Sequence, residues 1–170
     1  MHPLILGATP PIGLIEPPAA LILPDAIRQA MVGQALAARP VESVGLLATV
    51  GDGPAWRAVG WFPGANVDAS PSRYTMDRAD VRSALDRIAR RGWLLGGIVH
   101  SHPDHPAVPS ATDIREQARQ DALMVIISLA GGRPDVRAWR RVPGSPLATA
   151  RMAEVAIRTG TPPAGGEENW

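Results

Sequence analysis

The sequence predicts an α/β domain with a layered α-β-α arrangement, in which helices cover both faces of a central mixed β-sheet. Short apolar runs bounded by glycine and proline have the length of buried strands. Between these runs lie segments whose apolar residues recur every three or four positions, as on one face of a helix. Strands that alternate with helices in this way are typical of a layered α/β domain.

The first elements are a helix and a hairpin. Apolar residues at 25–38 fall on one helical stripe, and Pro40 supplies a stop. The run VGLLATV at 44–50 has the character of a buried strand. It leads through the turn GDGP into AWRAVGWF at 55–62, which we expect to be its hairpin partner.

The helix expected at residues 77–91 has the clearest signals in the chain. Its apolar residues repeat with helical spacing, Asp77 is a candidate N-cap, and Gly92 lies just past its end. The run WLLGGIVHSH at 93–102 follows as a strand. The remaining elements are expected to be a helix at 111–120, a strand at 122–129, its hairpin partner at 136–142 and a last helix at 146–157.

The two ends of the chain differ from its centre. Residues 1–18 are rich in proline and are expected to form an irregular arm, whereas 159–170 have the composition of a flexible tail. The folded domain is therefore expected at 19–158. The apolar start carries no Lys or Arg before its apolar run and is interrupted by prolines, so we expect a cytoplasmic protein without a membrane segment.

Composition excludes several classes of function. The net charge of +1 disfavours a dedicated nucleic-acid-binding protein. The chain has no cysteine, which excludes thiolate ligands and a cysteine nucleophile, and all 17 of its basic residues are arginine, so no lysine is available for a Schiff base. A transition-metal site would have to use His, Asp or Glu.

The stretch HSHPDHPAVPSATD at 100–113 contains the candidate metal ligands. His100 and His102 end a predicted strand two residues apart, so their side chains project from one face about 6.6 Å apart along the strand. Two imidazole nitrogens can then reach one zinc ion at about 2.0–2.1 Å. Asp113, in the first turn of the next helix, could supply the third ligand and leave a position open for water.

Each of these residues also fits a role without metal. Ser110 and Asp113 match the pattern of a helix capping box. His100 and His102 could be polar residues at the end of a strand, and His105 is expected to face solvent. Their joint spacing at a junction of strand, loop and helix favours the metal site.

In this spacing the sequence resembles the JAMM (JAB1/MPN+/Mov34) zinc metalloproteases, whose motif is a glutamate followed by H-[ST]-H-P-x6-S-x-x-D. The positions are filled by Glu42, by HSHP at 100–103, and by Ser110 and Asp113. The resemblance extends over about residues 21–142 and includes NVDASPSRYTMD at 66–77. It implies the JAB1/MPN fold, which is similar to that of cytidine deaminases.

The resemblance also implies a role for each residue of the motif. His100, His102 and Asp113 would hold one Zn²⁺ per chain, and Glu42 would be the general base. Ser110 would donate its hydroxyl to the developing oxyanion. Ser101 points to the opposite face from the ligands and is expected to be structural. Local sequence alone would pass Glu42 as the exposed start of a strand.

The function that follows is zinc-dependent hydrolysis of an amide or isopeptide bond. In this family the substrates are often C-terminal tails of ubiquitin-like proteins. The compact chain resembles stand-alone prokaryotic members, so the substrate expected is a ubiquitin-like or sulfur-carrier protein, with neither nucleic acid nor membrane as a partner. The apolar arm and Trp170 would allow a homodimer.

Two alternatives remain open from the sequence. One is a noncatalytic MPN-type scaffold that binds partners, although such relatives usually lack one or more metal ligands. The other is a peptidase of the same fold that acts on another substrate, such as a cell-wall peptide, or a protein related to the RadC group. A secretion signal or a helix-hairpin-helix module would favour these, and neither is evident in the sequence.

Overall fold

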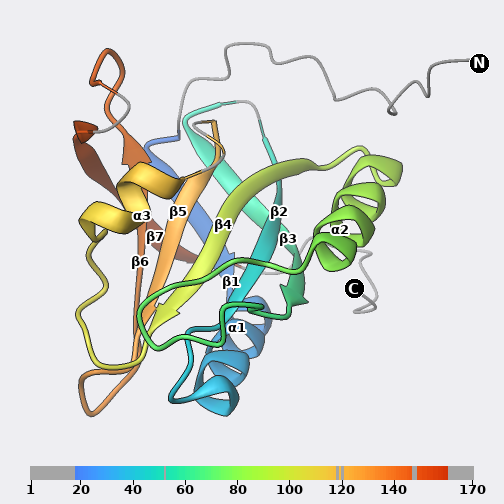
Figure 1. Cartoon of the computed structure of the whole chain (residues 1–170). Helices are drawn as coiled ribbons and strands as arrows, with labels where there is room; N and C mark the ends of the chain where they lie inside the picture. The colour runs from blue at the N-terminus through green and yellow to red at the C-terminus, as the bar shows by residue number, and fades with distance from the viewer. Residues whose placement is uncertain (1–17, 52, 118, 120, 147–148, 161–170) are drawn as a thin grey trace, which may run out of the picture.

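The computed structural model describes residues 18–51, 53–117, 119, 121–146 and 149–160 (Figure 1). Their elements in chain order are β1 (Ala20–Pro24), α1 (Asp25–Ala38), β2 (Val44–Val50), β3 (Ala55–Gly64), α2 (Arg78–Arg90), β4 (Leu94–His102), α3 (Ala111–Glu116), β5 (Leu123–Ser128), β6 (Asp135–Arg141) and β7 (Met152–Gly160). Residues 1–17 of the expected arm (1–18) and 161–170 of the expected tail (159–170) lie outside the described residues.

The strands form one mixed sheet that closes on itself in the order β1-β3-β2-β4-β5-β6-β7. Strand β1 runs parallel to both β3 and β7 and so joins the two ends of the sheet. Strands β4 and β5 are also parallel, and the other neighbours are antiparallel. The prediction of an α/β domain with a central mixed sheet is confirmed, whereas its closure was not expected.

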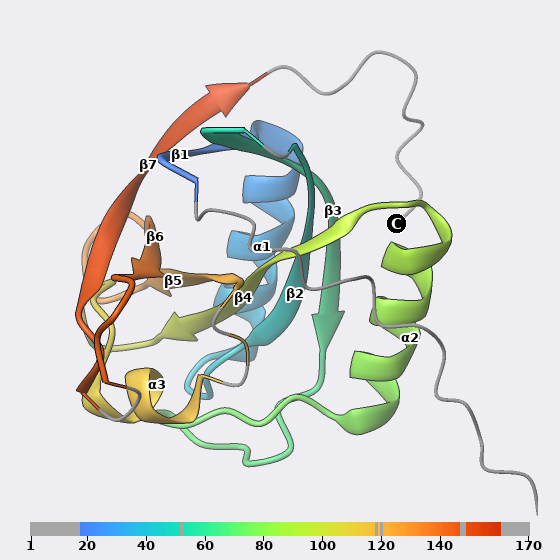
Figure 2. The same cartoon turned by 90° about the horizontal axis from the view of Figure 1, so that it is seen from above.

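Helices pack against both faces of this sheet because successive side chains of a strand point in opposite directions. Leu47 of β2 joins α1 and the strands in the main core. Its neighbours Leu46 and Ala48 instead pack with Ala84 and Ile88 of α2. Figure 2 shows α1 within the curve of the sheet and α2 outside it.

The helices agree with the sequence except near their ends and in the last element. Asp77 caps α2, as predicted, by accepting hydrogen bonds from the N–H groups of Ala79 and Asp80 at 2.8 and 3.2 Å. Helix α3 ends at Glu116 rather than at residue 120, because Gln117 turns into extended backbone and donates its side-chain amide to the carbonyl of Ala122 at 3.1 Å.

The prediction of a last helix at 146–157 is wrong, since residues Met152–Gly160 form β7. Alanine, methionine and glutamate in this segment favour a helix locally, but pairing with β6 and β1 outweighs that preference. Strand β1 was not predicted at all, because its apolar run directly precedes α1 and has no turn to separate them. None of the helices in the described ranges is long and apolar enough to cross a membrane.

The contact between β2 and β3 yields a prediction about stability. A Cβ atom added at Gly45 would collide with the ring of Trp61 and lie 2.7 Å from the carbonyl oxygen of Phe62. Overpacking of this kind typically costs about 1–3 kcal/mol. We therefore expect Gly45→Ala to lower the free energy of unfolding by that amount in urea denaturation.

A matched control is Gly33→Ala in α1, where an added Cβ has no neighbouring atom within 4 Å. This variant should be neutral or gain up to about 0.5–1 kcal/mol, because alanine is the better helix former. Equal unfolding curves for Gly45→Ala and the wild type would contradict the tight β2–β3 packing.

Candidate metal centre

The antiparallel pairing of β2 with β4 brings Glu42 to the two histidines. Val44 pairs with His100, so the same register carried two residues further places Glu42 opposite His102. Between these positions, the N–H of Ser43 donates to Ser101 Oγ at 2.8 Å, and the N–H of Ser101 donates to the carbonyl of Ser43 at 3.1 Å. Ser101 thus has the structural contact expected of it, and it connects the ligand strand to the segment that carries Glu42.

The N-terminus of α3 brings Asp113 to the same place. The capping box predicted by the sequence is present: the N–H of Asp113 donates to Ser110 Oγ at 3.1 Å, and the N–H of Ser110 donates to Asp113 Oδ2 at 2.7 Å. The cap fixes the Asp113 carboxylate beside the histidines, while Ser110 itself stays exposed. His105, in the loop before α3, is exposed and does not join the cluster.

The donor atoms of these three residues have separations close to those expected of a metal site. His100 Nε2 and His102 Nε2 lie 3.2 Å apart, and each is 3.4 Å from an oxygen of Asp113, Oδ1 for His100 and Oδ2 for His102. Atoms at tetrahedral positions around a zinc ion, 2.0–2.1 Å from it, are about 3.3 Å from one another. Two imidazoles and a carboxylate are also a donor set that zinc accepts. The residues therefore fit the metal that the sequence implies.

The hydrogen bonding of His102 leaves Nε2, the ring nitrogen that faces His100, available to bind a metal. Its Nδ1 lies 2.8 Å from the carbonyl oxygen of Pro106, which can only accept, so Nδ1 carries a proton and, in the neutral ring, Nε2 keeps a lone pair. His100 is fully buried, and its Nδ1 has no hydrogen-bond partner among the described residues. The ring of Tyr74 instead stacks on His100, with centroids 4.4 Å apart and planes inclined by 23°.

The cluster holds an anionic carboxylate beside two imidazoles that differ in proton affinity. Burial would favour protonated Asp113, but hydrogen bonds from His100 and His102 outweigh it and hold the pKa of the carboxyl well below its usual range. Burial lowers the pKa of His100. Burial also opposes charge on His102, yet its hydrogen bonds to Asp113 and Pro106 raise the pKa. A metal cation that displaced the imidazole protons would therefore be attracted by a carboxylate that is already ionised.

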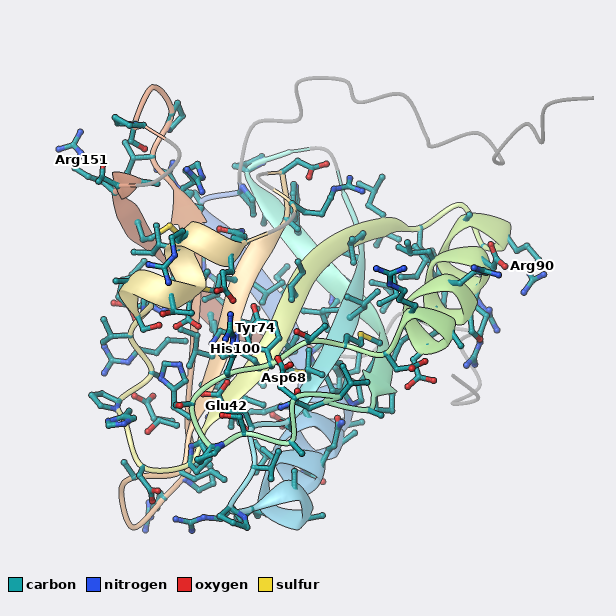
Figure 3. The ribbon with its side chains drawn as sticks, in the orientation of Figure 1. Glu42, Asp68, Tyr74, Arg90, His100 and Arg151 are labelled. Atoms are coloured by element: carbon teal, nitrogen blue, oxygen red, sulfur yellow. The ribbon has the colours of Figure 1, made fainter. Side chains whose placement is uncertain are left out.

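Glu42 has the properties of a proton acceptor that works near neutrality. Its side chain is 4% exposed, and Oε2 has no hydrogen-bond partner among the described residues. Burial raises the pKa of Glu42 to about 7, although the nearby charge of His102 lowers it in part. Figure 3 shows Glu42 below His100 and Tyr74 in the middle of the molecule.

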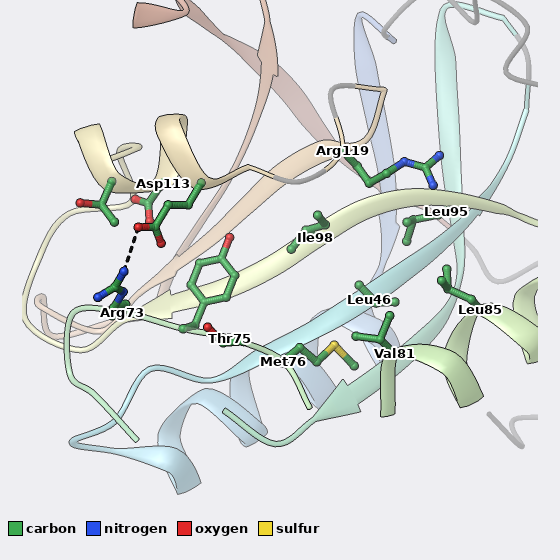
Figure 4. A pocket seen from close by; sticks show the side chains of 13 residues that line it. Leu46, Arg73, Thr75, Met76, Val81, Leu85, Leu95, Ile98, Asp113 and Arg119 are labelled. Atoms are coloured by element: carbon green, nitrogen blue, oxygen red, sulfur yellow. Dashed lines mark hydrogen bonds and ion pairs between the residues drawn. The ribbon is translucent and has the colours of Figure 1, made fainter. Parts of the chain in front are cut away.

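A groove of about 400 Å³ opens beside Asp113. Figure 4 shows its apolar wall, which comes from β2, β4, α2 and the segment that precedes α2. These apolar side chains are Leu46, Met76, Val81, Leu85, Leu95 and Ile98. Arg73 lies at the end near Asp113, where it forms a 3.0 Å ion pair with Glu116 of α3.

Two polar residues near the site were not singled out by the sequence. Tyr74 stacks on His100, and Asn66 hydrogen-bonds to both neighbours of Tyr74 and to the carbonyl of Glu42. Both lie in the segment at 66–77, whose overall likeness to the metalloprotease family was the only signal that pointed to it. No local pattern marks either residue, because their contacts are made across distant parts of the chain.

Comparison with known proteins gives concordant matches. A sequence profile of the prokaryotic homologs of the JAB domain matches residues 24–142. A "Desampylase" of Haloferax volcanii is 37% identical over 101 residues, which are 59% of this chain and 70% of that protein. A "Probable TtuB-protein conjugate cleaving protease" of Thermus thermophilus is 36% identical over 133 residues, which are 78% of this chain and 76% of that protein.

Solved structures agree with these matches. A protein of Desulfitobacterium hafniense, whose structure was determined in solution, has a TM-score of 0.70 and 28% identity, and the match covers 82% of this chain and 94% of that one. A protein of Salinibacter ruber, also solved in solution, has a TM-score of 0.59 and 30% identity over 86% of this chain and 96% of that one.

The raised pKa of Glu42 predicts a pH-dependent stability in chelator-treated protein. The folded state keeps the proton up to about pH 7, whereas an unfolded glutamate loses it near 4.5. Stability should therefore fall as the pH rises through this window. Glu42→Gln has no proton to lose, so we expect it to be more stable than the wild type by about 1–3 kcal/mol at pH 8, with the difference closing toward pH 4.5.

Denaturant unfolding at several pH values measures this difference. Glu154→Gln, at an exposed position of β7, is the matched control and should run parallel to the wild type. A constant difference between Glu42→Gln and the wild type across the whole pH range would show that Glu42 titrates like an exposed glutamate.

Proposed function

We propose, because this chain belongs to the prokaryotic homologs of the JAB domain, that it is a zinc-dependent peptidase that cleaves ubiquitin-like or sulfur-carrier proteins at their C-terminus. The observation that carries the proposal is the convergence of two imidazole nitrogens and a carboxylate within 4.8 Å of one another. A buried glutamate of raised pKa accompanies them. This combination is typical of a hydrolytic metal site and is unusual for a purely structural one.

In this proposal His100, His102 and Asp113 hold one zinc ion per chain. When bound, zinc would act as a Lewis acid that polarises the scissile carbonyl and would lower the pKa of water, so that hydroxide is available to attack this carbonyl at neutral pH. The protein's part is to keep the ligands in place: Pro106 fixes the tautomer of His102, and the Ser110 N–H orients the carboxylate of Asp113.

Glu42 is the general base. Its carboxylate takes a proton from the attacking water and later delivers it to the leaving amine. A pKa of about 7 suits both steps, because the group is then ready to accept a proton and also to give it up near neutral pH. Burial maintains this pKa and keeps bulk water from competing for the proton.

Ser110 serves in both of the roles considered for it. Its Oγ accepts the N–H of Asp113 at 3.1 Å as part of the helix cap. The hydroxyl proton is not needed for that bond. In the free protein it can donate to the Asp113 carboxyl, and in the reaction it would turn to the oxyanion that develops on the scissile carbonyl. The exposed position of Ser110 at the start of α3 leaves it accessible to a substrate.

The groove beside Asp113 is the proposed site for an extended substrate tail. Its apolar wall suits apolar side chains of the tail, and glycines at the scissile end would allow the chain to approach the ligands closely. The name of the Thermus thermophilus relative describes a protease that cleaves a protein conjugate. We therefore place both a carrier with a C-terminal extension and a carrier joined to another protein among the substrates.

The direct test is cleavage of candidate ubiquitin-like carriers that end in a short C-terminal extension, followed by mass spectrometry. We expect loss of the extension by the wild type, loss of activity with a chelator, and recovery with zinc. Glu42→Gln should bind zinc like the wild type but cleave about 10²–10⁴-fold more slowly, because general acid–base catalysis contributes that much.

The surface variant Glu154→Gln should cleave at the wild-type rate. Normal cleavage by Glu42→Gln would overturn the assignment of the base. Activity that survives complete removal of metal would overturn the metal mechanism itself.

A second prediction separates the two roles of Ser110. Loss of an oxyanion donor costs about 10²–10³ in rate, so Ser110→Ala and Ser110→Gly should both be impaired by about that factor. As a helix cap, however, glycine is only a few tenths of a kcal/mol worse than serine, whereas alanine costs about 1 kcal/mol. If Ser110→Gly retained activity while Ser110→Ala lost it, Ser110 would act only as a cap.

A further inference from the structure

The two histidines of the metal centre are held in different ways. His102 has the support usual for a metal ligand, since its second ring nitrogen hydrogen-bonds to the backbone carbonyl of Pro106 at 2.8 Å. The second nitrogen of His100 has no such partner among the described residues, although the side chain is fully buried. The orientation of the His100 ring must therefore be fixed by something other than a hydrogen bond on Nδ1.

The face of the ring provides that support. The Tyr74 ring lies nearly parallel to the imidazole, with centroids 4.4 Å apart and an angle of 23° between the planes. Stacking of two aromatic rings at about this distance is favourable. It restricts rotation of the imidazole about the Cβ–Cγ bond and so holds Nε2 toward His102 and Asp113, at 3.2 and 3.4 Å.

Tyr74 is itself held by a polar clamp on both sides. The Asn66 side-chain amide donates to the carbonyl of Arg73 at 2.9 Å, and its oxygen accepts the N–H of Thr75 at 3.1 Å. The same amide nitrogen donates to the carbonyl of Glu42 at 3.0 Å. One side chain thus ties the residues that flank Tyr74 to the backbone of the proposed base.

We propose that Tyr74, clamped by Asn66, is the positioning residue for His100, and that its stacked ring replaces the hydrogen bond that orients most metal-bound histidines. The inference rests on the proposed metal centre. It adds a third support to the site, besides Pro106 and the capping box, and relates the metal ligand His100 to Glu42 through the clamp.

The test measures metal binding, not peptide cleavage. Zinc affinity is determined by competition with a chromophoric chelator, and the visible spectrum of the cobalt-substituted protein reports the geometry of the ligands. Loss of an outer support typically weakens metal binding about 10–100-fold, so Tyr74→Leu and Tyr74→Met should raise the zinc dissociation constant at least about tenfold and alter the cobalt spectrum. Tyr74→Phe keeps the stacked ring and should match the wild type.

Asn66→Ala provides a second route if neither nonaromatic variant folds. It retains the ring but removes the clamp, and it should weaken zinc binding in the same direction. Wild-type affinity and spectrum in all of the folded nonaromatic and Asn66 variants would overturn the role of Tyr74 while leaving the metal centre intact. Weak binding by Tyr74→Phe would overturn the stacking argument, and absence of zinc binding by the wild type would overturn the proposed function as well.

Discussion

The register between β2 and β4 is the constraint on which the candidate site depends. The reciprocal hydrogen bonds of Ser43 and Ser101 hold this register just before the start of β2 and near the end of β4, next to Glu42 and His102. Because side chains alternate between faces, a slip of one residue would turn Glu42 away from the histidines. The buried side chains of both strands resist such a slip. It would move Leu46 and Leu47 each to the opposite face of the sheet, away from the core in which it packs. The hydrophobic packing of the domain therefore specifies the geometry of its polar site.

The candidate site buries polar side chains in the apolar interior, which lowers the stability of the fold. His100 is fully buried and Glu42 nearly so, and each has a polar atom without a hydrogen-bond partner among the described residues. Buried polar groups of this kind lower stability. Buried polar groups without hydrogen-bond partners are expected where a protein must keep reactive side chains. Glu42 is an example, because its carboxylate would lose the raised pKa if it were hydrogen-bonded and hydrated. Metal binding would return part of this free energy, since it would neutralise the carboxylate of Asp113 and occupy both Nε2 lone pairs.

Elements with strong local signals were predictable, whereas those made by distant pairing were not. Helix α2 was found from its spacing and its Asp77 cap, and the strand that ends in His100 and His102 from its apolar run. Strand β7 was assigned to a helix because only its partners β6 and β1 reveal that it is a strand. The same reasoning applies to the site: the histidines and Asp113 lie in one short motif, but Glu42 was found only through resemblance to a family. Asn66 and Tyr74 were missed because stacking and clamping across the fold leave no periodic mark.

The capping box and the metal site were rival interpretations of Ser110 and Asp113, and the structure makes them compatible. A carboxylate has about four lone-pair positions, and the cap uses only the one on Oδ2 that accepts the Ser110 N–H. Oxygens of the same group still lie 3.4 Å from each histidine. The cap costs the site nothing in ligand capacity, and it restricts the rotation of Asp113 that metal binding would otherwise have to suppress. A short helix of six residues can therefore supply a well-placed ligand, because its first turn is fixed by the cap rather than by its length.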